Sequence, residues 1–181
     1  MQGKAIRNLS VIVAVARNGA IGKGGDLLWH ISEDLKHFKA VTSGHTVLMG
    51  RATYLSFPRR PLPERFHIVL STTASVEDLQ VPETRRGDVV CVRNVEEALR
   101  NLPADEEAFV IGGGKVYEQF LPFCSTAYIT EVDAGFEADT FFPRLSSRSR
   151  ASSSSGWTCT ERSCAASIHL KSKGNCRPYF R

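Results

Sequence analysis

AFVIGGGKVYEQF, residues 108–120, has the pattern of a buried strand, a glycine turn and a helix in direct succession. The first four residues are apolar and predict a strand over 108–111, while residues 115–120 predict a helix. A strand that runs through a turn into a helix is the repeating unit of a parallel α/β sheet. This segment therefore predicts an α/β fold, in which ligands bind beyond the carboxyl ends of the strands.

The same alternation of strands and helices extends over residues 9–132. Residues 9–16, LSVIVAVA, form a near-continuous apolar run, which is typical of a strand buried on both faces. Ser32 is expected to cap a helix over 32–41. Further strands are predicted at 45–49, 67–71, 89–92 and 127–132, with helices at 51–57 and 95–102. We expect a single α/β domain whose central sheet is mixed, mostly parallel and flanked by helices.

Length and composition fit one such domain. The chain has 181 residues, of which 42% are hydrophobic and 23% charged, as is typical of one globular domain. No apolar run approaches the ~20 residues of a membrane span, and residues 1–8 lack the apolar core of a signal peptide. We therefore expect a cytoplasmic protein without a membrane segment. The domain is assigned to residues 9–143, with 1–8 as an N-terminal extension.

Residues 144–181 differ in character from the rest. They carry a charge of +7, whereas residues 1–143 carry −3, and they include SSRSRASSSS at 146–155. No period-2 or period-3.6 pattern is sustained to the end, so we expect a divergent, Ser/Arg-rich segment that is poorly ordered. Basic charge without an organised motif does not indicate nucleic-acid binding. The five cysteines form no CxxC pair, which argues against a metal site and a disulfide framework.

One acidic residue has an unexpected place on the helix predicted at 32–41. Leu35 and Phe38 should face the core, and Asp34 precedes Phe38 by four residues and Val41 by seven. Asp34 should therefore lie on or beside the apolar face, where its carboxylate is available to a ligand. The alternative is a solvated acid in the first turn, which the helix dipole favours.

Two glycine turns are candidate phosphate sites. Gly112, Gly113 and Gly114 stand between a strand and a helix, where the backbone can approach a phosphate; a tight structural turn explains them equally well. The segment MGRAT, residues 49–53, repeats the arrangement, with Arg51 and Thr53 as possible phosphate partners. The alternative for Arg51 is a solvated surface charge.

Taken together, these segments resemble one family, the dihydrofolate reductases. The matching segments are 9–16, Ile21-Gly22, Trp29, Asp34-Leu35, Phe38-Lys39, 47–51, Thr53-Tyr54, 60–63 with Arg65, 68–71, 110–117, 128–130, Asp139-Thr140 and Phe142-Pro143. The resemblance implies an NADPH-dependent reductase that converts 7,8-dihydrofolate to 5,6,7,8-tetrahydrofolate in one-carbon metabolism. The hydride would go to C6 and a proton to N5, without a metal. It also implies a monomer and antifolates as ligands.

The resemblance assigns the folate site residue by residue. Asp34 matches the carboxylate that anchors the pterin's 2-amino group and ring nitrogen; Thr130 matches the residue that supports it, and Trp29 completes the catalytic group. Arg65 matches the arginine that binds the α-carboxylate of the folate glutamate. The other folate contacts implied are Lys39 and Arg60 at the glutamate, and Ile12, Ala14, Leu35, Phe38, Phe57, Leu62 and Ile111 around the pterin and benzoyl groups. For each of these apolar residues a simple core role is the alternative.

The resemblance also implies an NADPH site. The residues on its adenosine and phosphate half would be Gly50, Arg51, Ala52, Thr53, Ser71 and Thr72. The residues that cradle the pyrophosphate would be Gly112, Gly113, Gly114, Lys115 and Val116, with a cis peptide bond between the first two. The nicotinamide would be bordered by Ala14, Ile21, Gly22 and Tyr117. Residues 17–29 would form a mobile loop that closes over the ring and excludes water.

Several positions depart from the family's pattern. Leu28 stands where proline usually precedes the tryptophan, which leaves the stiffness of the loop open. His67 replaces a common asparagine, and Ala138 a frequent glycine. The two terminal strands of the family cannot be identified in 144–181. A reading-frame change near residue 144 would explain their absence from the sequence pattern. The strand at 127–132 would then be an exposed edge.

Two rival functions fit parts of this evidence. Another pterin or pyrimidine reductase on the same fold would lack the acid at Asp34 or the arginine at Arg65. A catalytically impaired protein that binds NADPH or antifolates would keep both residues and lose turnover through its divergent C-terminus.

Overall fold

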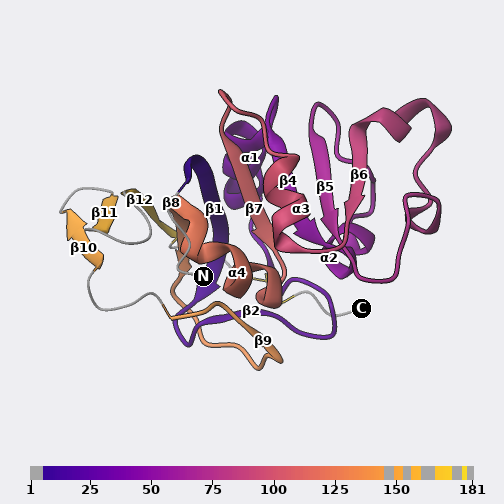
Figure 1. Ribbon diagram of the computed structural model, residues 1–181. Coiled ribbons are helices and arrows are strands. Elements are labelled where there is room, and N and C mark those ends of the chain that lie inside the picture. Colours follow the sequence, from indigo (N-terminus) through magenta and orange to yellow (C-terminus); the bar gives the residue numbers. More distant parts are fainter. Residues whose placement is uncertain (1–5, 145–148, 153–155, 160–165, 173–176, 179–181) are drawn as a thin grey trace.

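The computed structural model describes residues 6–144, 149–152, 156–159, 166–172 and 177–178. Nine strands form one sheet, which Figure 1 shows nearly face on. Across the sheet, the strands are β10 (Ser149–Ser152), β11 (Gly156–Cys159), β12 (Ala166–Ser172), β8 (Cys124–Val132), β1 (Ile6–Ala16), β7 (Ala108–Gly112), β4 (Thr46–Gly50), β5 (Phe66–Leu70) and β6 (Val89–Val92).

Helices and two small ribbons complete the described structure. The helices are α1 (Ser32–Thr42), α2 (Arg51–Ser56), α3 (Val95–Arg100) and α4 (Gly114–Phe120), with short 3-10 turns η1 (Glu77–Leu79), η2 (Glu83–Asp88) and η3 (Leu121–Phe123). One ribbon pairs β2 (Ala20–Gly22) with β9 (Thr140–Phe141), and the other pairs β3 (Trp29–His30) with β13 (Arg177–Pro178). In the part of the chain that the structure describes, no helix has the length and apolar character needed to cross a membrane.

The central sheet is parallel. β1 pairs in parallel with β7 and β8, β4 with β7 and β5, and β5 with β6. Antiparallel pairs join β10 to β11 and β11 to β12. The expected mixed, mostly parallel α/β sheet is therefore confirmed. Because the six central strands run in one direction, the residues that follow their carboxyl ends gather at one edge of the sheet.

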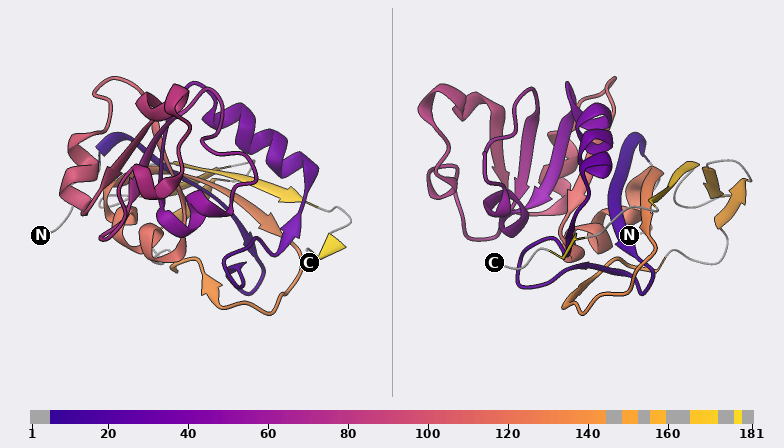
Figure 2. Two further views of the ribbon diagram at one scale, coloured as in Figure 1. Left: turned by 90° about the vertical axis from the view of Figure 1, so that its right-hand side faces the viewer. Right: turned by 180° about the vertical axis from the view of Figure 1, so that it is seen from behind.

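Helices cover both faces of the sheet. α1 lies on the face turned away from the viewer in Figure 1 and toward the viewer in the right-hand view of Figure 2, while α3 and α4 lie on the opposite face. Leu9 and Val11 of β1 pack with apolar residues of α3 and α4, whereas Ile12 packs with residues of α1 and α2. The predicted burial of this strand on both faces is therefore confirmed.

The start of α1 differs from the expectation. Ser32 is the first residue of the helix and not its cap; the residue before it, Ile31, takes the cap position with an extended backbone and no side-chain cap bond. Leu35 does not face the core, because its side chain is 38% exposed. The inward side of α1 instead carries Phe38 and Val41, which pack on the buried cluster of that face.

The described part of residues 144–181 corrects another expectation. Strands were not predicted here, yet β12 pairs in parallel with β8 from Ala166 opposite Thr126 to Ser172 opposite Val132. β8 therefore has a neighbour on each side and is not an edge strand. The sequence of β12, ASIHLKS, alternates apolar and polar residues, a short period-2 pattern that is hard to recognise beside a Ser-rich run. The division of the chain at residues 8 and 143, and the degree of order of the last segment, stay predictions.

Candidate active site

The acid Asp34 lies where α1 meets two strands and a second helix. Its side chain is half-buried and shares a hydrogen bond with that of Thr130 on β8, which is 5% exposed. Thr130 pairs with Ala14 of β1. From α4, the Tyr117 hydroxyl donates a hydrogen bond to the carbonyl oxygen of Ile12 at 2.9 Å. The structure therefore brings together residues that are up to about a hundred positions apart in the sequence.

Burial dominates the electrostatics of this cluster. Burial raises the pKa of the Asp34 carboxyl, while the hydrogen bond with Thr130 and the charge of His37 act in the opposite direction. Burial also raises the pKa of Tyr117, and the negative charge of Asp34 adds to that shift. Tyr117 thus stays a neutral donor. A partly desolvated carboxylate gains most from a ligand that brings a positive charge and hydrogen-bond donors.

The third catalytic candidate, Trp29, lies in β3 shortly before α1. It is 3% exposed, and its ring packs against that of Phe136 at a centroid distance of 5.1 Å. Leu28, at the family's usual proline position, is buried in the same cluster. Trp29 therefore supports the loop that precedes Asp34, while the direct hydrogen bond to Asp34 comes from Thr130.

The apolar candidates differ in how deeply they are buried. Ile12 and Ile111 are 6% and 9% exposed and belong to the core of the α1 face. The others keep part of their surface accessible and are Ala14, Leu35, Phe38, Phe57 and Leu62. Partial exposure of several apolar side chains is typical of a pocket wall, whereas a simple core would bury them fully.

Arg65 is buried and held in one orientation. It is 7% exposed; Nε donates to Thr42 Oγ1 at 2.9 Å, and Nη1 donates to the Pro63 carbonyl at 2.7 Å. Nη2 makes two longer contacts, with Ser43 Oγ at 3.2 Å and the Lys39 carbonyl at 3.4 Å. Among the described ion pairs none involves Arg65. The guanidinium charge is therefore available to an anionic ligand.

The two weaker glutamate candidates are placed differently. The Lys39 side chain is exposed on α1. Arg60 points back into its own loop, where Nη1 donates to the carbonyls of Leu55 and Phe57 at 3.2 Å each. Arg60 thus has a structural task in the turn, and Lys39 is free to follow a ligand at the surface.

The glycine turn after β7 leaves no room for larger side chains. A Cβ on Gly113 would lie 3.3 Å from Thr53 Oγ1, and a Cβ on Gly114 would lie 3.0 Å from Thr140 Cγ2. Gly112 has φ +131°, a conformation that favours glycine, and the peptide bond between Gly112 and Gly113 is cis, as expected. The turn therefore presents bare backbone beside the Thr53 hydroxyl, which fits the phosphate chain of a dinucleotide.

The matching turn after β4 lies against this one. A Cβ on Gly50 would lie 3.2 Å from Val116 Cγ2 of α4 and 3.9 Å from the Gly113 nitrogen, so the two turns come close together where Gly50 has no side chain. Arg51 and Ala52 at the start of α2, and Lys115 in α4, are exposed. Two cationic side chains consequently flank the glycine backbone without being buried in the core.

The ends of β5 and β6 supply further candidates. The Ser71 hydroxyl accepts a hydrogen bond from the Ala74 backbone N–H at 3.0 Å, so Ser71 shapes the turn, while Thr72 is exposed. Arg93 follows β6, and its Nη1 donates to the Thr72 carbonyl at 2.9 Å. Arg93 was not among the predicted cofactor residues, because it follows its strand without the glycine that precedes Arg51.

The expected lid, residues 17–29, is fastened to residues 133–142. The Phe142 N–H donates to the Gly19 carbonyl at 2.9 Å, and the Gly24 N–H donates to Asp139 Oδ2 at 2.7 Å. An ion pair between Lys23 and Glu137 lies at the surface beside them. Ile21 is 7% exposed within this ribbon. Opening the loop would break these contacts; its mobility stays a prediction.

Comparisons with known proteins agree with this geometry. The family model described as dihydrofolate reductase matches residues 8–166. Dihydrofolate reductase HdrB of Haloferax volcanii is 42% identical over 151 residues, which cover 78% of this chain and 74% of that protein. Dihydrofolate reductase type 3 of Salmonella typhimurium is 39% identical over 155 residues, which cover 86% of each chain. The dihydrofolate reductase of Bacillus subtilis is 36% identical over 137 residues, which cover 76% of each chain. Since the match spans most of the chain and contains the acid, the glycine turns and the buried arginine, the protein belongs to the dihydrofolate reductase family.

Proposed function

We propose that this protein reduces 7,8-dihydrofolate to 5,6,7,8-tetrahydrofolate with NADPH as the hydride donor, in support of one-carbon metabolism. The observation that carries this proposal is the half-buried Asp34, hydrogen-bonded to Thr130 at the carboxyl edge of the sheet. A dihydropterin offers that carboxylate an amino group and a ring nitrogen, which are donors of the right number and spacing. The carboxylate also favours the protonated ring, which is the form that accepts a hydride most readily.

The protein residues have separate tasks in this reaction. Asp34 and Thr130 orient the pterin, and the partly exposed apolar side chains, among them Phe38 and Leu62, exclude water from its faces. Arg65 binds a carboxylate of the glutamate tail, where the two η nitrogens form a planar fork. Antifolates that carry a diaminated ring engage Asp34 in the same way.

The cofactor site is built from the two glycine turns. NADPH supplies the hydride for C6 of the dihydropterin when it is bound there. Thr53 and the backbone of Gly113 and Gly114 would hold the pyrophosphate, and Arg51 and Arg93 would bind the phosphate on the adenosine half. Ile21 and Ala14 border the nicotinamide. We further propose that the enzyme works as a monomer, since one chain supplies every group in this account, and that it acts in the cytoplasm.

A spectrophotometric assay of NADPH oxidation tests the proposal. Turnover with dihydrofolate, and little with a pterin that lacks the benzoylglutamate tail, is the expected result. Turnover of the tail-less pterin at an equal or higher rate would favour the other pterin reductases. Tight binding of NADPH and a small antifolate, without turnover of either pterin, would instead identify a catalytically impaired protein.

Arg51→Ala is expected to raise the KM for NADPH about tenfold or more, the scale of one lost charge-assisted hydrogen bond. The KM for NADH should change much less, because NADH lacks the extra phosphate. Steady-state kinetics with both cofactors measure the difference. Arg100→Ala, which removes an exposed arginine at the end of α3, is the matched control and should leave both constants unchanged. If Arg51→Ala keeps the parent's preference for NADPH over NADH, the phosphate contact has to be assigned to Ser71, Thr72 or Arg93 instead.

A further inference from the structure

A closed set of polar contacts anchors the loop that carries Leu62 and Arg65. His67 of β5 is fully buried, and its Nε2 accepts a hydrogen bond from the Leu62 backbone N–H at 3.0 Å. A backbone N–H can only donate, so Nε2 is unprotonated, and the ring proton lies on Nδ1. Nδ1 therefore donates to the Asp88 carbonyl oxygen at 3.3 Å.

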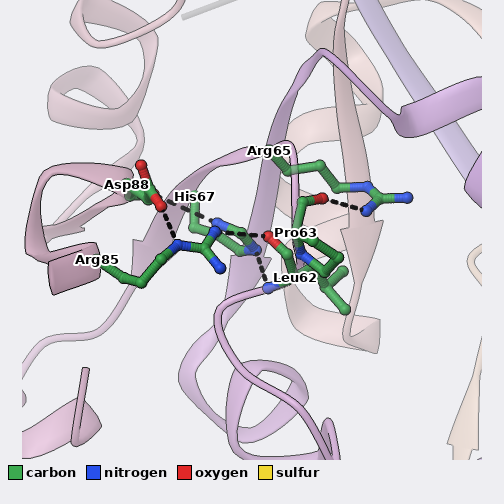
Figure 3. Close-up of polar contacts among 6 residues, drawn as sticks. All are labelled: Leu62, Pro63, Arg65, His67, Arg85 and Asp88. Atoms are coloured by element: carbon green, nitrogen blue, oxygen red, sulfur yellow. Dashed lines mark hydrogen bonds and ion pairs between the residues drawn. The ribbon is translucent and has the colours of Figure 1, made fainter. Parts of the chain in front are cut away.

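Arg85, which lies in η2, completes this set of contacts. Its Nη2 donates to the Leu62 carbonyl at 3.1 Å, and its Nε forms an ion pair with the Asp88 carboxylate. Both backbone polar groups of Leu62 are thereby bound, one by His67 and one by Arg85 (Figure 3). Asp88 binds both of these residues: its backbone carbonyl accepts from His67, and its carboxylate accepts from Arg85.

The anchored residue Leu62 is linked to the buried guanidinium of Arg65, three residues further along the chain. Arg65 Nη1 donates to the Pro63 carbonyl at 2.7 Å, and Pro63 directly follows Leu62. Glu64 then takes a left-handed conformation, with φ 57°, and its carbonyl accepts from the Gly44 N–H at 2.8 Å. Leu62, which is held by His67 and Arg85, therefore directly precedes the residue whose carbonyl accepts from Arg65 (Figure 3).

We propose that His67, Arg85 and Asp88 are positioning residues for the glutamate tail of the substrate, acting through Leu62 and Arg65. This proposal rests on the proposed function and names a second set of residues, remote from the substrate, on which that function depends. His67 is fully buried and both of its ring nitrogens are bonded, whereas the Arg85 and Asp88 side chains are 32% and 42% exposed. A buried and fully satisfied polar group holds its partners in one geometry. Here the group held in place is the planar guanidinium of Arg65, whose orientation decides whether two of its N–H groups can bond one carboxylate.

The electrostatics of the site agree with the assigned hydrogen bonds. Burial lowers the pKa of His67 to about 4, and the positive charges of Arg85 and Arg65 act in the same direction. Hydrogen bonds to backbone groups of Asp88 and Arg65 act against them. The ring of Tyr54 packs edge-on at 6.0 Å. The imidazole is therefore neutral near pH 7, as its acceptor role at Nε2 requires.

Arg85→Ala and its neighbour Arg86→Ala form a matched pair of variants, since Arg86 is exposed on the same turn. We expect Arg85→Ala to raise the KM for dihydrofolate, and the Kd of folate in calorimetry, about tenfold, a typical scale for coupled groups in one network. The kcat, the KM for NADPH and the Kd of a small antifolate without a glutamate should stay within about twofold of the parent. Arg86→Ala should leave all of these values unchanged. In an Arg65→Ala background, the further effect of Arg85→Ala on folate binding should disappear, which a general loss of stability would not produce.

Two results would overturn the proposal. The first is a folate Kd in Arg85→Ala equal to that of Arg86→Ala. The second is an effect of Arg85→Ala that adds fully to that of Arg65→Ala. If Arg85→Ala does not fold, Asp88→Asn removes the ion pair, keeps the backbone carbonyl and should weaken folate in the same selective manner; an unchanged Kd there equally refutes the proposal. If the parent protein binds folate but does not turn over dihydrofolate, the proposed function fails, while the folate Kd values still decide the positioning role.

Discussion

Asp34→Asn is expected to lower turnover near pH 7 at least ~100-fold, the usual scale for removing a group from acid–base chemistry. Asparagine keeps the shape and one hydrogen-bond acceptor, but it removes the negative charge that favours a protonated pterin. Turnover should recover in part at low pH, where the substrate is protonated before it binds. The pH dependence of kcat for parent and variant measures both effects. Glu33→Gln, at the exposed neighbour in the first turn of α1, should retain the parent profile.

The same substitution is expected to leave the ligand-free protein as stable as the parent or more so. Because burial raises the pKa of Asp34 above its ordinary value of 3.8, the folded state holds the proton more tightly than the unfolded state. Ionising the carboxyl therefore costs stability as the pH rises through the raised pKa. Asparagine does not ionise, so the variant should have a higher free energy of unfolding than the parent at pH 7. This difference should vanish below about pH 3.8, the ordinary pKa of the carboxyl group. Denaturant titrations at several pH values measure this difference.

A large loss of stability at pH 7 in Asp34→Asn would show that the carboxylate is a structural group. Near-parental turnover at pH 7 would remove Asp34 from the chemistry. If Asp34→Asn is as stable as the parent or more so, but has lost turnover, then Asp34 serves the reaction and lowers the stability of the fold.

The parts of the fold that sequence could predict depend on local patterns. The apolar run of β1 and the glycine turn after β7 carry their periodicity and turn residues within a few positions, and the structure confirms both. The left-handed Gly112 is likewise a local property. The short ribbon of β2 and β9 was not predicted, because its residues pair across more than a hundred positions and neither segment shows a strand pattern alone.

Side-chain roles were harder to predict for the same reason. Asp34 could be singled out because its spacing to Phe38 lies within one helix. Leu35 was misplaced because a two-residue repeat does not determine which way a short helix faces. The anchoring role of Arg85 has no local signal: Asp88 is an i,i+3 partner within η2, but the contact with Leu62 depends on the packing of η2 on the loop before β5. His67 stood out only as a departure from the family's common asparagine.

Arg65→Ala is expected to weaken folate-type ligands by about 2–4 kcal/mol, the range for removing one partner of a buried charged pair. This corresponds to a loss of roughly 30- to 1,000-fold in affinity. The guanidinium has five N–H groups; Nε and one hydrogen of Nη1 are used by Thr42 and Pro63, and Nη2 has only the two longer contacts. A carboxylate can therefore take the second hydrogen of Nη1 and replace one of the longer contacts of Nη2. Arg65→Lys keeps the charge without the fork and should recover only part of the affinity.

Selectivity between ligands separates binding from folding in this variant. Arg65 is buried and orders the end of α1 through Thr42 and Ser43, so its removal also lowers the free energy of unfolding. A less stable protein would bind every ligand more weakly in proportion to its unfolded fraction, whereas a lost carboxylate contact weakens only ligands that carry the glutamate. Calorimetric Kd values for folate and for a small antifolate without a glutamate, measured well below the melting temperature, distinguish the two. Arg59→Ala, an exposed arginine of the same loop, is the control and should alter neither. Equal weakening of both ligands in Arg65→Ala would show that the guanidinium holds the loop and does not bind the substrate.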